Sequence, residues 1–177
     1  EDFGNMDVLC TDKTGTLTEG KIVLKDYFSL GEEKDPRILP YSLLCNAAVV
    51  AEKITGNAMD AAIWQYALGK RADRSLKPYT KVDEVPFDYQ RRMMSVVVRK
   101  GNELTLIAKG APEAVLARCK SVETKHSHEP MTKGLEREIR GKFEDLSQQG
   151  YRVLAVAYGT PEEKASYTSK DETDLTL

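Results

Sequence analysis

Two runs rich in β-branched residues, 93–99 and 104–108, constrain the fold of this chain most, because only four residues separate them. Those four residues, KGNE, contain the pair Gly101 and Asn102, which is typical of a tight turn. Two strands joined by so short a connection pair antiparallel. We therefore predict a β-hairpin over this part of the chain.

Helical patterns lie on both sides of the predicted hairpin. Asn57 is a favourable N-cap and Gly69 a favourable stop, so we predict a helix over residues 57–68. Residues 35–48 begin with Asp-Pro, a helix-start signal, and continue with apolar residues at helical spacing. The same spacing recurs before a capping glycine and predicts a further helix: Leu135, Ile139, Phe143, Leu146 and Gly150.

The remaining patterns complete an α+β fold. We predict strands over 81–85 and 151–158, a short helix over 110–119, an extended stretch over 22–30 and an irregular polar course over 164–174. Helices and an antiparallel hairpin together favour an antiparallel β-sheet flanked by helices. The 177 residues, 41% of them hydrophobic, suffice for one ordinary domain core.

The N-terminal residues carry a different pattern. Residues 6–10, MDVLC, fit a buried strand that ends abruptly in polar residues. A buried strand that leads into a loop suited to phosphate chemistry is the usual opening of a parallel α/β domain. We therefore predict two parts: residues 1–20 as a strand and loop from one domain, and residues 21–177 as the antiparallel domain.

Residues 12–18, DKTGTLT, offer what phosphoryl transfer to a carboxylate requires. Asp12 follows the strand and can attack a γ-phosphoryl group. Lys13 adds positive charge, and Thr14 can offer backbone and hydroxyl donors to phosphate oxygens. Mg²⁺ would offset the charge of the two anions that must meet. The structural alternative is a turn rich in Thr and Gly in which Asp12 is a capping residue.

The string DKTGTLT resembles the phosphorylation signature of the P-type ATPases, whose phosphorylation domain belongs to the haloacid-dehalogenase superfamily. The resemblance implies that Asp12 accepts phosphate from ATP, that Lys13 and Thr14 assist, and that Asp12 and Thr14 lie at a Mg²⁺ site. Phosphatases of the superfamily usually carry a second aspartate where this chain has Thr14. A hydroxyl is no general acid near neutral pH, which argues against the runner-up, a soluble phosphatase.

Four further segments resemble the nucleotide-binding domain of the same family. They occur in this order: 56–63, 84–96, 109–113 and 150–157. The resemblance implies that Phe87 stacks on adenine, that Asp60 meets the adenine side and that Arg152 contacts phosphate or ribose. It completes the ATP pocket with Arg92, Met94, Lys109, Gly110 and Leu154.

Each of these segments also has a plain structural interpretation. Asp60 could be a first-turn carboxylate favoured by the helix dipole. Phe87 could be a core residue, and Arg91 with Arg92 a solvated surface pair. A non-catalytic nucleotide-binding module would use the same pocket, although DKTGTLT would be unnecessary in it.

The sequences of residues 3–10, 83–88 and 170–175 are most similar to those of magnesium-transporting P-type ATPases. The resemblance implies a cytoplasmic part of an integral plasma-membrane pump, whose partners are ATP and the remaining phosphorylation, actuator and transmembrane domains of the same polypeptide. Calcium and proton pumps share most of these sequence motifs. The family's later motifs, TGD and GDGxNDxP, do not occur in the 177 residues, so we expect this fragment to bind ATP without appreciable turnover.

Composition excludes several other classes. A formal net charge of -2 gives no case for nucleic-acid binding. No apolar run reaches the ~18 residues that span a bilayer, so we expect this fragment not to insert into a membrane. Three cysteines without CxxC spacing support neither a disulfide framework nor a zinc site, and the His126-x-His128 pair favours a solvated loop.

Overall fold

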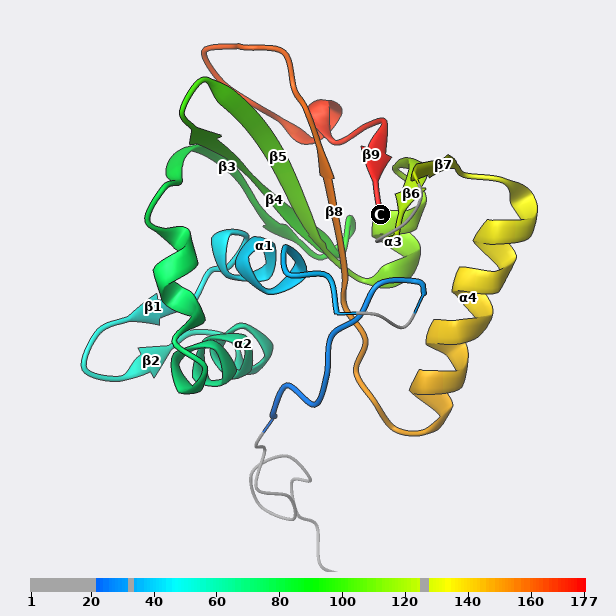
Figure 1. Ribbon diagram of the computed structural model, residues 1–177, viewed down its shortest axis with the longest axis horizontal. Helices are drawn as coiled ribbons and strands as arrows, with labels where there is room; N and C mark the ends of the chain where they lie inside the picture. The colour runs from blue at the N-terminus through cyan, green and yellow to red at the C-terminus, as the bar shows by residue number, and fades with distance from the viewer. Residues whose placement is uncertain (1–21, 32–33, 125–127) are drawn as a thin grey trace, which may run out of the picture.

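The computed structural model describes residues 22–31, 34–124 and 128–177 (Figure 1). The predicted strand over 6–10 lies outside the described residues, as do Asp12, Lys13 and Thr14. The predicted domain boundary near residue 20 lies outside them as well. No helix among the described residues has the length and apolar character that a membrane crossing requires.

A seven-stranded sheet forms the centre of the molecule, in the order β3-β4-β5-β8-β9-β6-β7. Neighbouring strands pair antiparallel, except that β9 runs parallel to β6. The strands are β3 (Thr80–Asp88), β4 (Met93–Lys100), β5 (Glu103–Gly110), β6 (Cys119–Glu123), β7 (His128–Pro130), β8 (Ala155–Gly159) and β9 (Leu175–Thr176). The predicted α+β class with a mainly antiparallel sheet is confirmed.

The predicted hairpin is the pair β4–β5. Its register runs from Lys100 opposite Glu103 to Met93 opposite Gly110 without a shift. Every residue of β4 from Met93 to Val98 is buried, because the sheet is covered on both faces. A strand covered on both faces needs a continuous apolar run instead of alternation, which explains the unbroken valines of this segment.

Alternate side chains of the hairpin enter two separate cores. On one face they pack around Cys45 at the end of α1 (Ile38–Leu44): Met94, Val96, Val98 and Ile107. On the other face the hairpin supplies Met93, Val97, Leu106 and Ala108. These side chains pack against Val115 of α3 (Pro112–Leu116) and against Tyr167 and Leu175 of the C-terminal segment. Burial raises the pKa of the Cys45 thiol to about 12, so Cys45 acts as a small apolar core residue.

The helix α2 (Ala58–Gly69) extends the first core outward. Its side chains Ile63 and Ala67 pack against Leu39 and Leu43 of α1, and the 3-10 helix η2 (Ala72–Leu76) closes the group. The predicted cap is confirmed, since the backbone N–H of Asp60 donates to the side-chain oxygen of Asn57 at 2.9 Å.

The predicted helix over 135–146 is α4 (Lys133–Gln148), which Thr132 caps through a hydrogen bond from the N–H of Leu135. None of its residues is buried, and α4 contacts α3 at one side of the molecule, apart from α1 and α2 (Figure 1). Gly150 follows the helix with φ of +87°, a backbone conformation that glycine adopts without strain.

Several predicted bounds differ from the structure. The helix α1 ends at Leu44, four residues before the predicted limit, because the N–H of Ala47 donates to the carboxylate of Asp60 and not to the helix. Cys119 begins β6 where a helix was predicted. The stretch over 22–30 forms no strand.

Other differences concern short elements. Val49–Val50 and Ile54–Thr55 form a small two-stranded sheet, β1–β2, that no local pattern predicted. The polar course over 164–174 contains a 3-10 turn, η3 (Ser169–Asp171), with a capping box between Thr168 and Asp171.

Gly110 is the position at which the hairpin tolerates no side chain. A Cβ there would lie 2.4 Å from the carbonyl oxygen of Arg92 and 2.4 Å from the Cβ of Met93. We expect Gly110→Ala to lower the free energy of unfolding by about 1–3 kcal/mol, the usual cost of an overpacked site. Urea denaturation measures this loss.

A matched control is Gly141→Ala in α4, where a Cβ meets no atom within 4 Å. Alanine is a better helix former than glycine, so this variant should gain about 0.5–1 kcal/mol. Equal stability of the two variants would contradict the close approach at Gly110.

Candidate functional site

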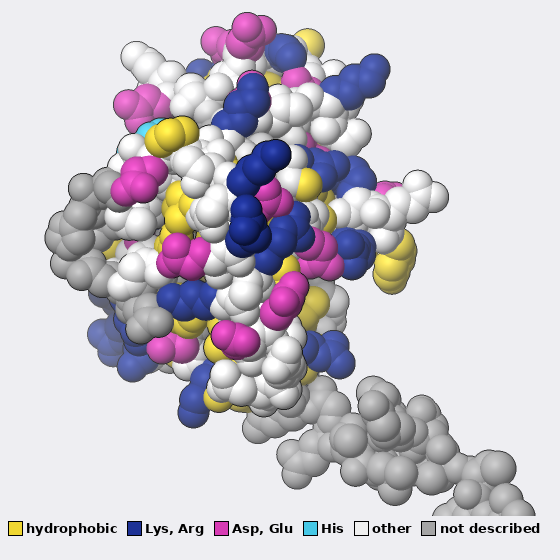
Figure 2. All heavy atoms as spheres, turned by 90° about the vertical axis from the view of Figure 1, so that its right-hand side faces the viewer, with side chains coloured by type: hydrophobic (Ala, Val, Ile, Leu, Met, Phe, Trp, Pro, Cys, Tyr) yellow, Lys and Arg dark blue, Asp and Glu magenta, His cyan; other side chains and the backbone are white. Residues whose placement is uncertain are grey.

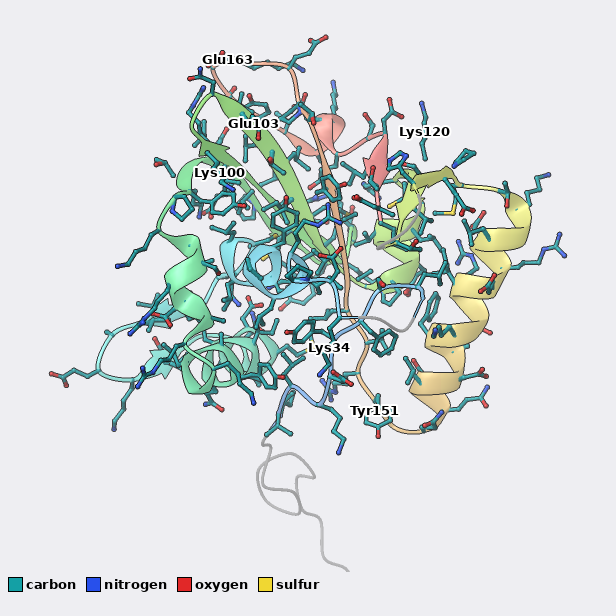
Figure 3. All side chains as sticks on the ribbon, in the orientation of Figure 1. Lys34, Lys100, Glu103, Lys120, Tyr151 and Glu163 are labelled. Carbon is teal, nitrogen blue, oxygen red and sulfur yellow. The ribbon has the colours of Figure 1, made fainter. Side chains whose placement is uncertain are left out.

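The strand register gathers the predicted pocket residues at one end of the sheet. β3 and β5 end there, at Asp88 and Gly110, while β4 and β8 begin there. Met94 lies opposite Lys109, and Gly110 lies opposite Ala155. Seven predicted residues therefore belong to one end: Phe87, Arg92, Met94, Lys109, Gly110, Arg152 and Leu154. Lys100 and Glu103, beside the hairpin turn, mark the opposite end (Figure 3).

Asp60 joins this group through a buried ion pair with Lys109. The Nζ of Lys109 lies 2.5 Å from Oδ1 of Asp60, and the two side chains are 4% and 5% exposed. The ammonium also donates to the carbonyl oxygen of Ser42 at 3.3 Å. Lys109 thus points toward the helices and not into open solvent.

The second oxygen of Asp60 is equally well bound. It accepts hydrogen bonds from the N–H of Ala47 at 3.0 Å and from the side-chain amide of Asn57 at 2.8 Å. Both oxygens of Asp60 thus accept hydrogen bonds, the condition under which a buried carboxylate is tolerated. Asp60 therefore connects α2 with β5 and with the segment that follows α1. It is a carboxylate in the first turn of α2, as the alternative interpretation has it, but it also binds residues distant in sequence.

Phe87 lies at the surface, which excludes the interpretation that it is a core residue. Its side chain is 50% exposed, and its ring packs edge to face on that of Tyr89, with centroids 5.3 Å apart. Tyr89 is itself 88% exposed. Two flat rings in solvent at the end of a sheet form a surface on which a planar ligand can stack.

Arg92 occupies the turn between β3 and β4 and has φ of +54°, an uncommon backbone conformation for a residue with a Cβ. Its N–H donates to the carbonyl oxygen of Asp88 at 2.7 Å, and its guanidinium lies 2.6 Å from Glu113. The side chain keeps 55% exposure. Arg92 therefore lies at the surface, as the alternative interpretation of a solvated arginine has it, and its role toward ATP stays a prediction.

The other predicted residues differ in their surroundings. Met94 is buried beside Cys45, and Leu154 packs on the α1–α2 core. Gly110 makes room for the backbone of Arg92, so a contact within the chain already requires a glycine there. Arg152 is exposed in an irregular segment before β8. The predicted strand over 151–158 was wrong for its first four residues, which include Arg152.

A cavity of about 850 Å³ opens beside this end of the sheet. It is surrounded by the segment 22–30, by α1, by one face of α4 and by residues 149–154, the approach to β8. Figure 3 shows Tyr151 on that approach, between α4 and β8. Three of the predicted residues line the cavity, namely Lys109, Arg152 and Leu154. Phe87 lies outside its lining, so the exposed rings and the cavity are separate features.

A polar cluster that no local pattern predicted lines the same cavity. The guanidinium of Arg37 lies 2.6 Å from Asp35 and 2.9 Å from Glu123, and the hydroxyl of Tyr158 donates to Glu123. The hydrogen bond from Arg37 lowers the pKa of Asp35. Burial, together with the hydrogen bond to Glu123, raises the pKa of Tyr158 to about 12. One cation here faces two anions, so the cluster offers no surplus positive charge.

The described residues contain no group of three His, Cys, Asp or Glu side chains that could hold a metal ion. The two predicted metal ligands, Asp12 and Thr14, lie outside the described residues. On the face that carries α4, Lys and Arg side chains are interspersed with Asp and Glu (Figure 2), as a net charge of -2 leads one to expect.

Glu172 is a buried residue that the sequence did not single out for a role. Its side chain is fully buried and binds Arg91, whose Nη1 lies 2.5 Å from both carboxylate oxygens. Arg91 is only 15% exposed, so the interpretation of Arg91 as a solvated surface residue was wrong. The partners lie 81 positions apart in the sequence, beyond the reach of any local pattern.

Comparison with known proteins gives one family. The family model described as "P-type ATPase, cytoplasmic domain N" matches residues 36–177. The magnesium-transporting ATPase, P-type 1, of Escherichia coli K12 is 36% identical over 179 residues, which cover 100% of this chain and 20% of that protein. A probable cation-transporting P-type ATPase of Mycoplasma genitalium is 32% identical over 159 residues, 89% of this chain and 17% of its own length.

A calcium-transporting ATPase of Listeria monocytogenes is 28% identical over 195 residues, which cover 100% of this chain and 22% of that protein. The chain thus spans about a fifth of the length of the curated relatives it matches.

The Asp60–Lys109 pair yields a stability prediction. Lys109→Met leaves the Asp60 carboxylate buried without its cation, and we expect the free energy of unfolding to fall by about 3–5 kcal/mol. Denaturant titration at neutral pH measures this change.

Lys120→Met is the matched control, because Lys120 pairs with Asp174 at the same 2.5 Å while 75% and 60% of the side chains are exposed. Exposed pairs contribute little, so we expect a change within about 0.5 kcal/mol. If both variants lose the same stability, the burial of the Asp60–Lys109 pair has no energetic consequence.

Proposed function

Because this chain belongs to the P-type ATPases, matching their cytoplasmic domain N over residues 36–177, we propose that ATP binds at the end of the sheet where β3 and β5 end and β4 and β8 begin. The observation that carries the proposal is the exposed ring of Phe87 at the end of β3. Burial of an aromatic ring stabilises a fold, so a half-exposed ring without a core role suits a ligand better. An adenine base would stack on it.

The neighbouring charges suit the rest of the nucleotide. Arg92 and Arg152 are exposed cations at the same end of the sheet, and they would attract phosphate oxygens. Lys109 is held by Asp60, so we assign it to the floor of the site and not to a free contact with phosphate. The ion pair would fix α2 against β5 while ATP is bound.

For the intact protein we propose that ATP reaches Asp12 on a separate domain, which residues 1–20 begin. A carboxylate oxygen of Asp12 would attack the γ-phosphorus, the bond from that phosphorus to the bridging oxygen would break, and ADP would leave. Mg²⁺ would neutralise the phosphate charge, with Asp12 and Thr14 at its site and Lys13 nearby. Thr14 cannot act as a base for water, which would keep the aspartyl phosphate long-lived.

We further propose magnesium as the transported ion and the cytoplasmic side of a plasma membrane as the location of this domain. The E. coli relative, at 36% identity, is named a magnesium-transporting ATPase. The Listeria relative, at 28%, is named a calcium-transporting ATPase. The higher identity favours magnesium. The remaining phosphorylation, actuator and transmembrane parts of the pump would be the partners of this domain.

Calorimetry of ATP binding to the 177-residue chain tests the stacking role. Phe87→Ala should weaken binding by about 5- to 100-fold, the range of one base–aromatic stack. Val82→Ala removes another exposed apolar side chain of β3, 43% exposed, and should leave the affinity unchanged. Unchanged affinity in Phe87→Ala would contradict the proposed site.

The separate placement of Asp12 gives a second test. Asp12→Asn should leave ATP affinity nearly intact, because Asp12 would meet the γ-phosphate only when two domains close. The same reasoning predicts no appreciable transfer of radiolabelled γ-phosphate from ATP to Asp12 in the isolated chain. Labelling of the unmodified chain, absent in Asp12→Asn, would overturn this expectation.

A further inference from the structure

The carboxylate of Glu172 is completely buried and surrounded by donors from three segments. Arg91 reaches it from the turn after β3, and the hydroxyl of Ser95 in β4 donates to it at 2.8 Å. Arg118, after α3, lies 3.5 Å away. A charge buried to this degree is tolerated only with such a complete set of partners. The cluster therefore fixes the relative positions of the three segments.

Arg91 differs from the other partners because the second acceptor of its planar guanidinium lies next to Phe87. Nη1 binds Glu172, while Nη2 donates to the carbonyl oxygen of Pro86 at 2.7 Å. Pro86 directly precedes Phe87 in the chain. The arginine thus links the buried carboxylate to the backbone immediately before the exposed ring.

The turn that carries Phe87 is ordered from its other side by Asp88. One oxygen of that side chain accepts from the backbone N–H groups of Gln90 and Arg91, at 2.9 and 2.8 Å. These bonds order the turn within itself, whereas the contact of Arg91 with Glu172 attaches the turn to the core. An exposed ring has few packing contacts of its own, so its position depends on such attachment of its backbone.

The segment that supplies Glu172 is itself held against β3. The N–H of Tyr167 donates to the carboxylate of Asp83 at 2.7 Å, and Thr168 and Asp171 form the capping box of η3. Glu172 therefore approaches the turn from a fixed support. Second contacts of this kind commonly orient the residues that touch a ligand.

We propose that Glu172 and Arg91 are positioning residues for the nucleotide, holding residues 86–92 so that the Phe87 ring is already placed to receive adenine. The inference rests on the proposed function, since it assumes that Phe87 stacks on the base. Neither residue contacts the nucleotide. Their effect on affinity passes through the backbone of Pro86 and Phe87.

Arg91→Lys is the sharpest variant. Lysine retains the positive charge for Glu172 but lacks the planar fork that binds two acceptors at once. We expect ATP and AMP to bind about 3- to 10-fold more weakly, part of the value of a base stack. Equal losses for both ligands are expected, because the affected contact is with the base and not with the β- and γ-phosphates.

Arg118→Lys is the matched control, because Arg118 approaches the same carboxylate while its Nη1 donates to Ala114 in α3 and not to the turn. Its ATP affinity should stay within about 2-fold of the unmodified chain. The double variant Phe87→Ala/Arg91→Lys completes the design. Once the ring is gone, Arg91→Lys should cause no further loss.

Thermal unfolding and calorimetry on the same samples separate the outcomes. A loss in Arg91→Lys that disappears in the Phe87→Ala background supports the inference. Unchanged affinity in Arg91→Lys, with a clear loss in Phe87→Ala, overturns the positioning role and leaves the proposed ATP site standing. A loss that persists undiminished in the double variant also overturns it. Unchanged affinity in Phe87→Ala alone counts against the ATP site itself.

Glu172→Gln provides an independent readout, because glutamine keeps the shape of the side chain while removing its charge. Where this variant folds, judged by the thermal transition, it should weaken AMP and ATP as Arg91→Lys does. A folded Glu172→Gln protein with unchanged AMP affinity would also overturn the inference.

Discussion

The register between β4 and β5 is the constraint on which the rest of the molecule depends. Both faces of this hairpin are buried, so a shift by one residue would exchange the two cores. The same register brings the end of β5 opposite the start of β4 and of β8. The proposed nucleotide residues therefore meet at one end as a consequence of packing elsewhere in the sheet.

Buried charge then fixes the surroundings of that end. Lys109 and Asp60 join the helices to β5, and Arg91 and Glu172 join the β3–β4 turn to the C-terminal segment. Each pair connects segments distant in sequence, and each would be costly to break. Lys109 and Arg91 are held by buried carboxylates. The better candidates for phosphate contacts are therefore Arg152, which is exposed, and Arg92, whose ion pair with Glu113 stays open to solvent.

The elements that the sequence predicted well have local causes. The hairpin follows from β-branched runs about a Gly-Asn turn, and α2 follows from the Asn57 cap. The early end of α1 and the burial of Glu172 depend on partners elsewhere in the chain, which no neighbouring residue reveals. For the site, family resemblance supplied the residues and the register brings them together, while their roles toward ATP stay predictions. The ion pair between Lys109 and Asp60 joins residues far apart in the sequence and is evident only from the three-dimensional structure.

The position of β9 bears on how such a sheet can assemble. β9 lies between β8 and β6, with Leu175 opposite Cys119, so β6 and β7 reach the rest of the sheet through it. The three strands β3, β4 and β5 can pair as neighbours in the sequence, whereas β6 can join them only through β9, whose residues lie some fifty-five positions after β6. During synthesis, which proceeds from the N-terminus, β3, β4, β5 and β8 could pair before β9, the strand that links them to β6 and β7, had been made. A partly made chain would thus expose the edges of β8 and β6, the edges most open to pairing with another chain.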